Sequence, residues 1–329
     1  MSRRALVIGT RGSRLALRQT EIVLAALRSA HPGAAFEVRT LHTEGDRSAA
    51  SLSEIGGRGV FVVELERALL AGEIDIAVHS LKDLPSEETD GLAIAATLPR
   101  EDVRDVLITR DGSPLSGLPA GAAVGTGSPR RACQVLALRP DLRIRDIRGN
   151  VDTRIRKVQE GGYDAVVLAA AGLARLGWLD RASQVFTLAE MLPAAGQGAL
   201  AVQVRSDDER ALPAVKTLDH ADTHIAVTAE RAFERRLGGG CHAAIAALGL
   251  PSPPPAAGDP SPAARARGEE AATLRLLGLV GAPDGRLLRA EIEGAAEEAE
   301  SLGSRLAERL LAEGAAALLA SAPSGEAAS

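Results

Sequence analysis

One short pattern occurs twice in the chain and constrains its fold more than any other feature. An apolar run breaks at a glycine and restarts as a helical pattern behind a serine, first over residues 6–13 and again over residues 122–131. The pattern is typical of a strand, a tight turn and a helix N-terminus, capped by Ser13 in one copy and by Ser128 with Pro129 in the other. The repeat therefore predicts two similar lobes.

Arginines stand beside both turns, which indicates that each turn binds an anion. Backbone N–H groups and the helix dipole favour negative charge at a helix N-terminus, and the arginine fork matches a carboxylate or a phosphate. Residues 121–160 hold eight arginines and one lysine against four acidic residues, a local net charge of +5, although the whole chain carries −5. A basic region on an acidic protein predicts a specific anionic ligand.

The similarity between the two halves extends beyond these turns. Residues 71–78 and 160–167 both predict a strand that begins at an aspartate, and a new helix is expected directly behind each, at Ser80 and near Ala171. Strands that alternate with helices predict a parallel sheet in each lobe, with ligands at the carboxyl ends of the strands. We interpret the arrangement as a two-lobed α/β clamshell that holds its ligand between the lobes.

Composition and charge exclude several classes of protein. A length of 329 residues allows two or three domains, and the negative net charge argues against a nucleic-acid-binding protein. No apolar run approaches the roughly 20 residues that cross a bilayer, and the first residues are unlike a signal peptide, so we expect a cytoplasmic protein without membrane contact. Two cysteines and scattered histidines predict neither a disulfide framework nor a metal site.

Changes in pattern divide the chain into three domains. We expect residues 1–99 together with 199–217 to form the first lobe and residues 100–198 to form the second, Arg-rich lobe. Residues 221–329 are expected to form a smaller α+β domain with a Pro-rich insertion at 251–268.

Other segments support this division. A predicted strand at residues 199–204 could complete the sheet of the first lobe, and a helix is expected from Thr223 through Arg236. Predicted strands at 273–280 and 287–292 flank a Pro-Asp-Gly turn, which is a strong hairpin signal.

The sharpest local feature is the polar run at residues 80–83, where an apolar strand ends. It predicts Asp83 in the first turn of a helix at the carboxyl edge of the sheet, with Lys82 beside it. A capped helix with a surface ion pair explains this run equally well. In the functional interpretation, Asp83 transfers protons while arginines hold the carboxylates of a substrate.

Four arginines lie at predicted turns between strands and helices of the second lobe. They are Arg130, Arg131, Arg148 and Arg154, and Arg175 on a following helix can join them. A single arginine is more often a solvated surface residue, but four at one edge of a sheet indicate an anion site.

Cys241 follows three glycines, which form a loop that can present a thiol. The commoner role of a cysteine is that of a small buried hydrophobic residue. His242 is adjacent in sequence, and sequence neighbours rarely face each other, so we predict no Cys–His dyad.

Several separated motifs resemble those of the porphobilinogen deaminase family. The resemblance covers about residues 5–250 and is specific because it rests on many motifs at once. They are GTRGSRLAL at 9–17, TEGD at 43–46, GGRGVF at 56–61, VHSLKDLP at 78–85, RGNV at 148–151, PAAGQGA at 193–199, AER at 229–231 and GGC at 239–241.

The resemblance implies a type II periplasmic-binding-protein-like clamshell with the activity of a hydroxymethylbilane synthase. Such an enzyme condenses four porphobilinogen molecules head to tail with loss of ammonia, and it releases hydroxymethylbilane for haem, sirohaem, corrin and chlorophyll synthesis. Cys241 would carry a dipyrromethane cofactor through a thioether, and Asp83 would be the general acid and base. The family expectation is a monomer whose product passes to uroporphyrinogen-III synthase.

The resemblance also assigns ligand contacts. The residues that match cofactor- and substrate-contacting positions are Arg11, Ser13, Ser80, Lys82, Thr126, Ser128, Arg130, Arg131, Arg148, Arg154, Arg175 and Gln197. Arg58 and Phe61 would belong to a mobile loop, although Arg58 and Glu54 stand where the family often has lysine.

Two other functions fit parts of the pattern. A non-catalytic anion-binding receptor would share the two lobes without needing Asp83 or Cys241. A thiol-dependent transferase would use Cys241 as a free nucleophile. A dipyrrole-sized excess in the intact mass, lost with Cys241→Ser, separates both from a deaminase.

Overall fold

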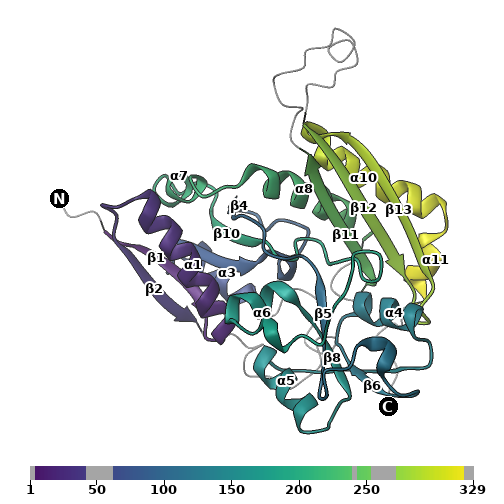
Figure 1. Cartoon of the computed structure of the whole chain (residues 1–329). Coiled ribbons are helices and arrows are strands. Elements are labelled where there is room, and N and C mark those ends of the chain that lie inside the picture. The colour runs from purple at the N-terminus through teal and green to yellow at the C-terminus, as the bar shows by residue number, and fades with distance from the viewer. Residues whose placement is uncertain (1–3, 42–61, 239–242, 253–271, 322–329) are drawn as a thin grey trace, which may run out of the picture.

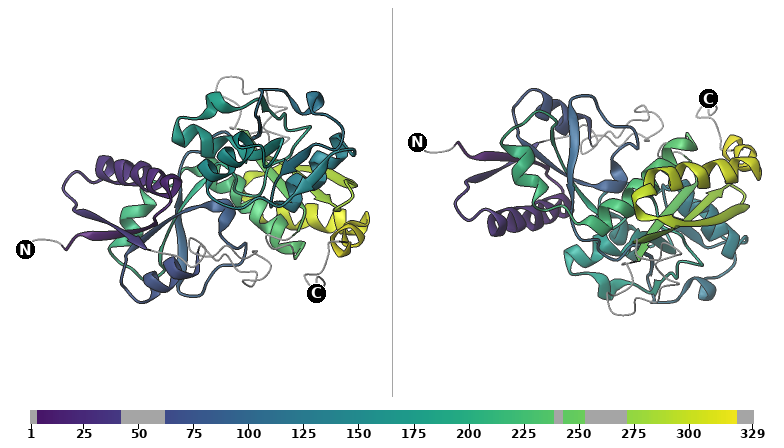
Figure 2. Two further views of the ribbon diagram at one scale, coloured as in Figure 1. Left: turned by 90° about the horizontal axis from the view of Figure 1, so that it is seen from below. Right: turned by 90° about the horizontal axis from the view of Figure 1, so that it is seen from above.

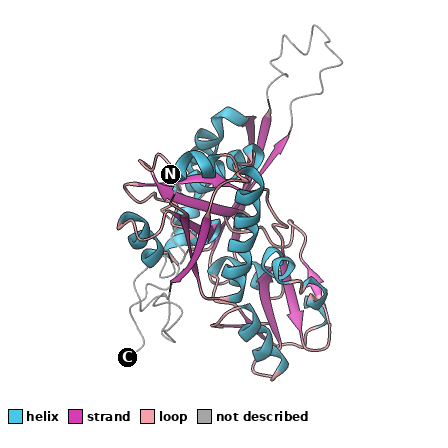
Figure 3. Ribbon diagram, turned by 90° about the vertical axis from the view of Figure 1, so that its left-hand side faces the viewer, coloured by secondary structure: helices cyan, strands magenta, loops and turns pink. Residues whose placement is uncertain are grey.

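The computed structural model describes residues 4–41, 62–238, 243–252 and 272–321. Two five-stranded sheets and one three-stranded sheet form three bodies, with helices against the sheet faces (Figures 1 and 3). The two larger bodies lie side by side, and the third packs beside the second (Figure 2). The prediction of a two-lobed α/β clamshell with a third α+β domain is confirmed.

The first sheet has the strand order β2-β1-β3-β10-β4. Its strands are β1 (Leu6–Arg11), β2 (Phe36–Leu41), β3 (Ile76–Ser80), β4 (Leu92–Thr97) and β10 (Leu200–Arg205). Its helices are α1 (Arg14–Ala30), α3 (Val63–Leu70) and α7 (Ala211–Lys216), with a short 3₁₀ turn, η1 (Leu81–Asp83). Helix α1 buries Val23 and Leu27 against one face of the sheet, and α3 buries Leu65 and Leu69 against the other. Burial on both faces explains the continuous apolar runs of the central strands.

The second sheet repeats this arrangement in the order β7-β6-β8-β5-β9. Its strands are β5 (Asp105–Thr109), β6 (Ala123–Gly125), β7 (Arg143–Arg145), β8 (Ala165–Ala169) and β9 (Gln184–Val185). Its helices are α4 (Pro129–Leu138), α5 (Val151–Gln159) and α6 (Ala170–Leu176), with the 3₁₀ turns η2 (Leu115–Gly117) and η3 (Leu179–Arg181). The two lobes therefore have the same architecture, as the repeated sequence pattern predicted.

An aspartate makes the same contact in each lobe. Asp75 accepts a hydrogen bond from the backbone N–H of Val7 at 2.9 Å, and Asp164 accepts one from the N–H of Ala123 at 2.7 Å. Each carboxylate ties the start of one strand to the start of its parallel neighbour. The repeated aspartates noted in the sequence thus serve the sheets rather than a ligand.

The prediction that the sheets are parallel was wrong in one respect. β10 enters the first sheet after the chain has passed through the second lobe, and it runs antiparallel to β3 and β4. β5 takes the matching place in the second sheet, antiparallel to β8. Each sheet therefore receives one reversed strand as the chain crosses between the lobes. The strand predicted at 199–204 does join the first sheet, while the domain limits themselves stay predictions.

The third sheet is an antiparallel meander of order β11-β12-β13. Its strands are β11 (Ile245–Ser252), β12 (Thr273–Gly281) and β13 (Leu287–Ala295), and its helices are α8 (Ala221–Arg236), α10 (Ala299–Ala312) and α11 (Ala315–Ala320), with a 3₁₀ turn, η4 (Ala296–Glu298). The predicted hairpin and the helix ending at Arg236 are confirmed. Phe233, Leu276 and Leu306 lie in the core between the helices and the sheet.

The two lobes also touch away from the crossover. The ring of Trp178 lies 4.8 Å from the guanidinium carbon of Arg14 in the first lobe and 4.6 Å from that of Arg181 in the second. A tryptophan face attracts cations of this kind. The first helix of one lobe is therefore held against the other lobe.

A buried carboxylate joins all three bodies. Glu230 on α8 binds both terminal nitrogens of Arg100, at 2.5 and 3.0 Å, and accepts the backbone N–H groups of Gly196 and Gly249. Residues 100 and 196 lie on the two segments that cross between the lobes. Glu230 therefore fixes both crossover segments to the third domain.

The second crossover segment depends on glycine. Gly198 has φ +88, and a Cβ there would overlap the carbonyl oxygen of Glu101. We expect Gly198→Ala to lower the free energy of unfolding by at least about 2 kcal/mol in urea denaturation, because strain and overlap add. Gly72 also has a positive φ but no atom within 4 Å, so Gly72→Ala should cost only about 1 kcal/mol. Equal losses would contradict this account.

Candidate active site

The two predicted anion turns are helix starts capped by serine. Ser13 caps α1 by accepting the N–H of Ala16 at 3.2 Å, and Ser128 caps α4 by accepting the N–H of Arg131. Thr126 accepts the N–H of Ser128 at 3.1 Å and so stiffens the second turn. The caps predicted from sequence are confirmed, and these hydroxyls satisfy backbone groups of their own turns.

Asp83 lies at the end of η1, directly after β3. The expectation that it occupies the first turn of a helix is confirmed, and this helix is a single 3₁₀ turn of three residues. Leu84 is extended, as a residue before proline prefers, and Pro85 follows. The side chain of Asp83 is exposed and makes no hydrogen bond within the described ranges. A proton-transfer group at this place is open to a ligand.

Cations of the second lobe lie close to Asp83. Burial lowers the pKa of Arg131 and of Arg154, to about 10 in Arg154, and neighbouring arginines lower both further, whereas Asp83 raises them. Asp83 belongs to the first lobe and the two arginines to the second. The carboxylate of Asp83 therefore lies near positively charged side chains of the second lobe.

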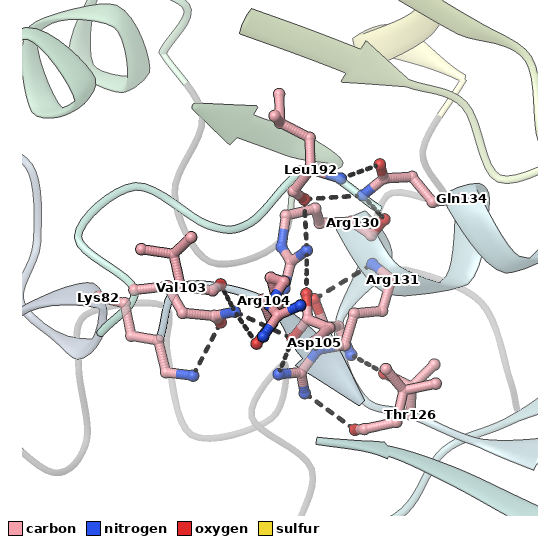
Figure 4. Close-up of polar contacts among 12 residues, drawn as sticks. Lys82, Val103, Arg104, Asp105, Thr126, Arg130, Arg131, Gln134 and Leu192 are labelled. Atoms are coloured by element: carbon pink, nitrogen blue, oxygen red, sulfur yellow. Dashed lines mark hydrogen bonds and ion pairs between the residues drawn. The ribbon is translucent and has the colours of Figure 1, made fainter. Parts of the chain in front are cut away.

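Arg130 and Arg131 bind a carboxylate of the protein itself. Asp105, the first residue of β5, accepts from Nη1 of Arg130 at 2.8 Å and from Nε and Nη2 of Arg131 at 3.0 and 2.7 Å (Figure 4). Relative exposure is 0% for Asp105, 3% for Arg130 and 7% for Arg131. The picture of these two arginines as free anion donors therefore needs correction, since much of their hydrogen-bonding capacity is used internally.

The charge state of Asp105 follows from this pairing. Burial would raise the pKa of the Asp105 carboxyl, but the two guanidinium groups outweigh burial and hold the pKa well below its usual range. Sequence reasoning missed Asp105. The available signal was an aspartate at the head of an otherwise apolar, buried strand.

Lys82 points toward the crossover segment. Its Nζ donates to Oε1 of Gln197 at 3.2 Å, and Nε2 of Gln197 donates to the carbonyl of Val103 and to Asp105. Burial lowers the pKa of Lys82 to about 8, with a further lowering by Arg131 and an opposing effect of Asp83 and Asp105. Lys82, Gln197 and Asp105 thus form one connected chain of polar groups.

The other predicted arginines each have a local partner. Arg148 donates to Asp146 at 2.8 Å, Arg154 donates to the carbonyl of Gly149, and Arg175 donates to the carbonyl of Gly198. Burial lowers the pKa of Arg175 to about 10. These three side chains keep further N–H donors beyond the single bond that each makes.

The remaining predicted residues divide into two groups. Ser80 ends β3 and accepts from Nε2 of Gln19 at 2.8 Å, a contact that sequence reasoning missed, and Arg11 ends β1 close enough to lower the pKa of His79, although burial lowers it more. Arg58, Phe61 and Cys241 lie outside the described residues.

The assembled site favours a ligand with several carboxylates. Five cations lie in one another's electrostatic range here, against the three carboxylates of Asp83, Asp105 and Asp146; the cations are Lys82, Arg130, Arg131, Arg148 and Arg154. Burial is the main cause of the lowered pKa values of Lys82, Arg131 and Arg154, and neighbouring cations lower them further. Bound carboxylates would relieve that repulsion. Among the described residues, no group of three or more potential ligands could hold a metal ion, and no helix is long and apolar enough to span a membrane.

The structure predicts a large loss of stability when Asp105 loses its charge. Asp105→Asn keeps the shape but leaves two buried guanidiniums uncompensated, so the free energy of unfolding in urea should fall by about 3–5 kcal/mol at pH 7. Asp102→Asn is the matched control, because it breaks the exposed ion pair with Arg104, and it should cost less than about 1 kcal/mol. Similar losses in both variants would contradict a structural role for Asp105.

The pairing of Asp105 with the two arginines also makes the stability of the fold depend on pH. The folded pKa of Asp105 is depressed, so its ionised form stabilises the fold fully above the unfolded value of about 3.9. That contribution is lost as the pH falls below about 4 toward the folded value. The stability difference between the native protein and Asp105→Asn should therefore be constant from neutral pH to about pH 5 and shrink in acid.

Comparisons with known proteins show the family to which the chain belongs. Residues 6–213 match the family described as porphobilinogen deaminase, dipyromethane cofactor binding domain. The porphobilinogen deaminase of Roseiflexus sp. (strain RS-1) is 48% identical over 319 residues, which cover 97% of this chain and 99% of the relative. That of Thermus thermophilus is also 48% identical, over 96% of this chain and 99% of the relative. Among solved structures, the VFT2 domain of Bordetella pertussis BvgS aligns at a TM-score of 0.41 and 17% identity, over 65% of this chain and 86% of that one. The chain belongs to the porphobilinogen deaminase family.

Proposed function

We propose that the protein is a hydroxymethylbilane synthase. It condenses four porphobilinogen molecules head to tail, with loss of ammonia, on a covalently bound dipyrromethane, and it releases hydroxymethylbilane for tetrapyrrole biosynthesis. The observation that carries the proposal is the exposed carboxylate of Asp83 opposite buried cations of the second lobe. Family membership supports the same conclusion.

The described residues fit a dipyrromethane. Each of its rings bears an acetate and a propionate, and the site has cations whose pKa values are lowered by burial and by neighbouring arginines. Lys82, Arg131, Arg148 and Arg154 would hold these carboxylates by charge-assisted hydrogen bonds. When bound, the dipyrromethane supplies the nucleophilic pyrrole end to which the first substrate is joined.

Cys241 is the proposed attachment point. The third domain contacts the segment that follows Asp83, because Arg231 on α8 donates to the carbonyl of Ser86 at 3.3 Å. Cys241 itself lies outside the described residues, and its role as the thioether attachment point rests on the family resemblance.

Asp83 has the position needed to move protons. Loss of ammonia from porphobilinogen requires a proton on the departing amine and leaves positive charge on the pyrrole ring. A carboxylate beside the ring offsets that charge and can accept or return a proton at a pyrrole nitrogen. Arginines that hold the ring carboxylates keep the reacting carbon in place.

The remaining ligand contacts are proposals of differing strength. Five of these residues stand at strand ends or helix starts at the carboxyl ends of the parallel strands, which supports their assignment: Arg11, Ser13, Ser80, Thr126 and Ser128. Arg175 lies in the last turn of α6 and is proposed from the family resemblance. Arg130 acts through Asp105 instead. A cytoplasmic monomer that passes its product to uroporphyrinogen-III synthase is part of the same proposal.

Removing the charge of Asp83 tests its role. Asp83→Asn should lower kcat for porphobilinogen consumption by roughly 10²- to 10⁴-fold, the usual contribution of a positioned acid and base, while Asp83→Glu should show an intermediate loss. Glu87→Gln neutralises an exposed carboxylate four residues away and should leave kcat within about twofold of the native value. Near-native turnover in Asp83→Asn would contradict the assignment of Asp83 as the general acid and base.

The covalent link is tested by intact mass. The native protein should exceed its sequence mass by one dipyrromethane, and Cys241→Ser should lack that excess. Cys133→Ser is the matched control, because the Cys133 thiol is fully buried, donates to the carbonyl of Arg130 and has its pKa raised by burial to about 11. The bare sequence mass in the native protein, with no porphobilinogen consumed, would favour an anion-binding receptor.

A further inference from the structure

Gln197 is completely enclosed, although family resemblance places it among the ligand contacts. Its relative exposure is 0%. Its Oε1 accepts from Nζ of Lys82 at 3.2 Å, and its Nε2 donates to the carbonyl of Val103 at 2.7 Å and to Oδ1 of Asp105 at 3.0 Å. Both ends of the amide are therefore occupied by the protein, and neither end reaches the cleft.

The backbone holds this side chain in place. Gly196 has φ +71 and Gly198 has φ +88, so Gln197 sits between two residues in the left-handed region that turns the chain sharply. The carbonyl of Gln197 accepts from Nε of Arg100 at 2.8 Å, and the N–H of Gly196 donates to Glu230. Gln197 is thus an anchored group on the crossover segment.

Lys82 has two acceptors within its reach, and it binds only one of them. Its Nζ donates to Gln197, and within the described part of the chain it forms no ion pair with Asp83, its neighbour in sequence. The charge of Asp83 acts on Lys82, so its carboxylate is an alternative partner for the ammonium. The group that binds the ammonium is Gln197 instead.

We propose that Gln197 is a positioning residue that links Lys82 to Asp105 of the other lobe and so keeps Asp83 free of an internal ion pair. This inference rests on the proposed role of Asp83 in proton transfer. The ammonium then serves ligand carboxylates from a fixed place, and the Asp83 carboxylate stays available to the substrate. Gln197 acts entirely through Lys82 and does not contact the ligand.

Gln197→Met tests the tether, because methionine has a similar length but neither donor nor acceptor. The chain has only three lysines, Lys82, Lys157 and Lys216, so the holoenzyme labelled with ¹³Cε-lysine gives three side-chain signals that titrate separately. Lys82→Met assigns the signal of interest. In Gln197→Met, Lys82 is released toward Asp83, and its proton affinity should rise by roughly tenfold or more, seen as a higher titration midpoint.

Gln134→Met is the matched control. Gln134 is also 0% exposed and also bridges the backbone, with Nε2 donating to the carbonyls of Arg130 and Leu192 and Oε1 accepting the N–H of Leu192. The control reproduces the loss of a buried amide without touching Lys82. Its Lys82 midpoint should match that of the native protein.

Turnover gives an independent check. Gln197→Met should lower kcat by roughly 10- to 100-fold, as expected when a reacting group is misplaced, and it should have little further effect in a Lys82→Met background because it acts through that lysine. An unchanged or lowered Lys82 midpoint, or losses that multiply in the double variant, would overturn the proposal. The titration needs no turnover, so a failure of the proposed function would show separately as a native enzyme that consumes no porphobilinogen.

Discussion

The ion pair network around Asp105 is the constraint on which the rest of the site depends. One carboxylate with no solvent exposure binds two guanidinium groups on the first turn of α4 and the amide of Gln197 on the crossover segment. A buried charge is tolerated only when it is paired and hydrogen-bonded. The second lobe can therefore concentrate positive charge at one edge of its sheet because one aspartate neutralises part of it from behind. Lys82, Arg148 and Arg154 make no hydrogen bond to Asp105 and keep further N–H donors for a ligand.

Local features of the fold could be predicted from the sequence because they depend on residues close together in the chain. Ser13 and Ser128 cap helices through atoms three residues away, and the Pro-Asp-Gly turn joins adjacent strands. The duplication was also visible, since each lobe repeats the same order of strand, turn and helix. Asp83 was correctly predicted in the first turn of a helix, and that helix is limited to one 3₁₀ turn before the extended Leu84 and Pro85.

Contacts between segments far apart in the sequence could not be predicted. The reversed strands β10 and β5 arise because the chain crosses between the lobes twice. The direction of each depends on a distant partner, β3 about 120 residues from β10 and β8 about 60 residues from β5, so it cannot be predicted from the strand's own residues. From the sequence alone, Asp105 is an ordinary residue at the start of a strand, and only the folded structure shows that α4 supplies its two arginine partners. Arg130 and Gln197 were assigned to the ligand by family resemblance, whereas the structure shows both bound to protein groups. Motifs identify which residues matter, but only packing shows what each one touches.

The central claim is that carboxylates of a tethered oligopyrrole bind Lys82, Arg148 and Arg154 while Asp83 faces the pyrrole nitrogens. A crystal structure of the native enzyme with its covalent pyrrole chain tests this most directly. The account predicts ring carboxylates within hydrogen-bond distance of Lys82, Arg148 and Arg154, and an Asp83 oxygen within the same distance of a pyrrole N–H. Ring carboxylates that point into solvent, or a pyrrole chain whose nitrogens lie beyond the reach of Asp83, would contradict it.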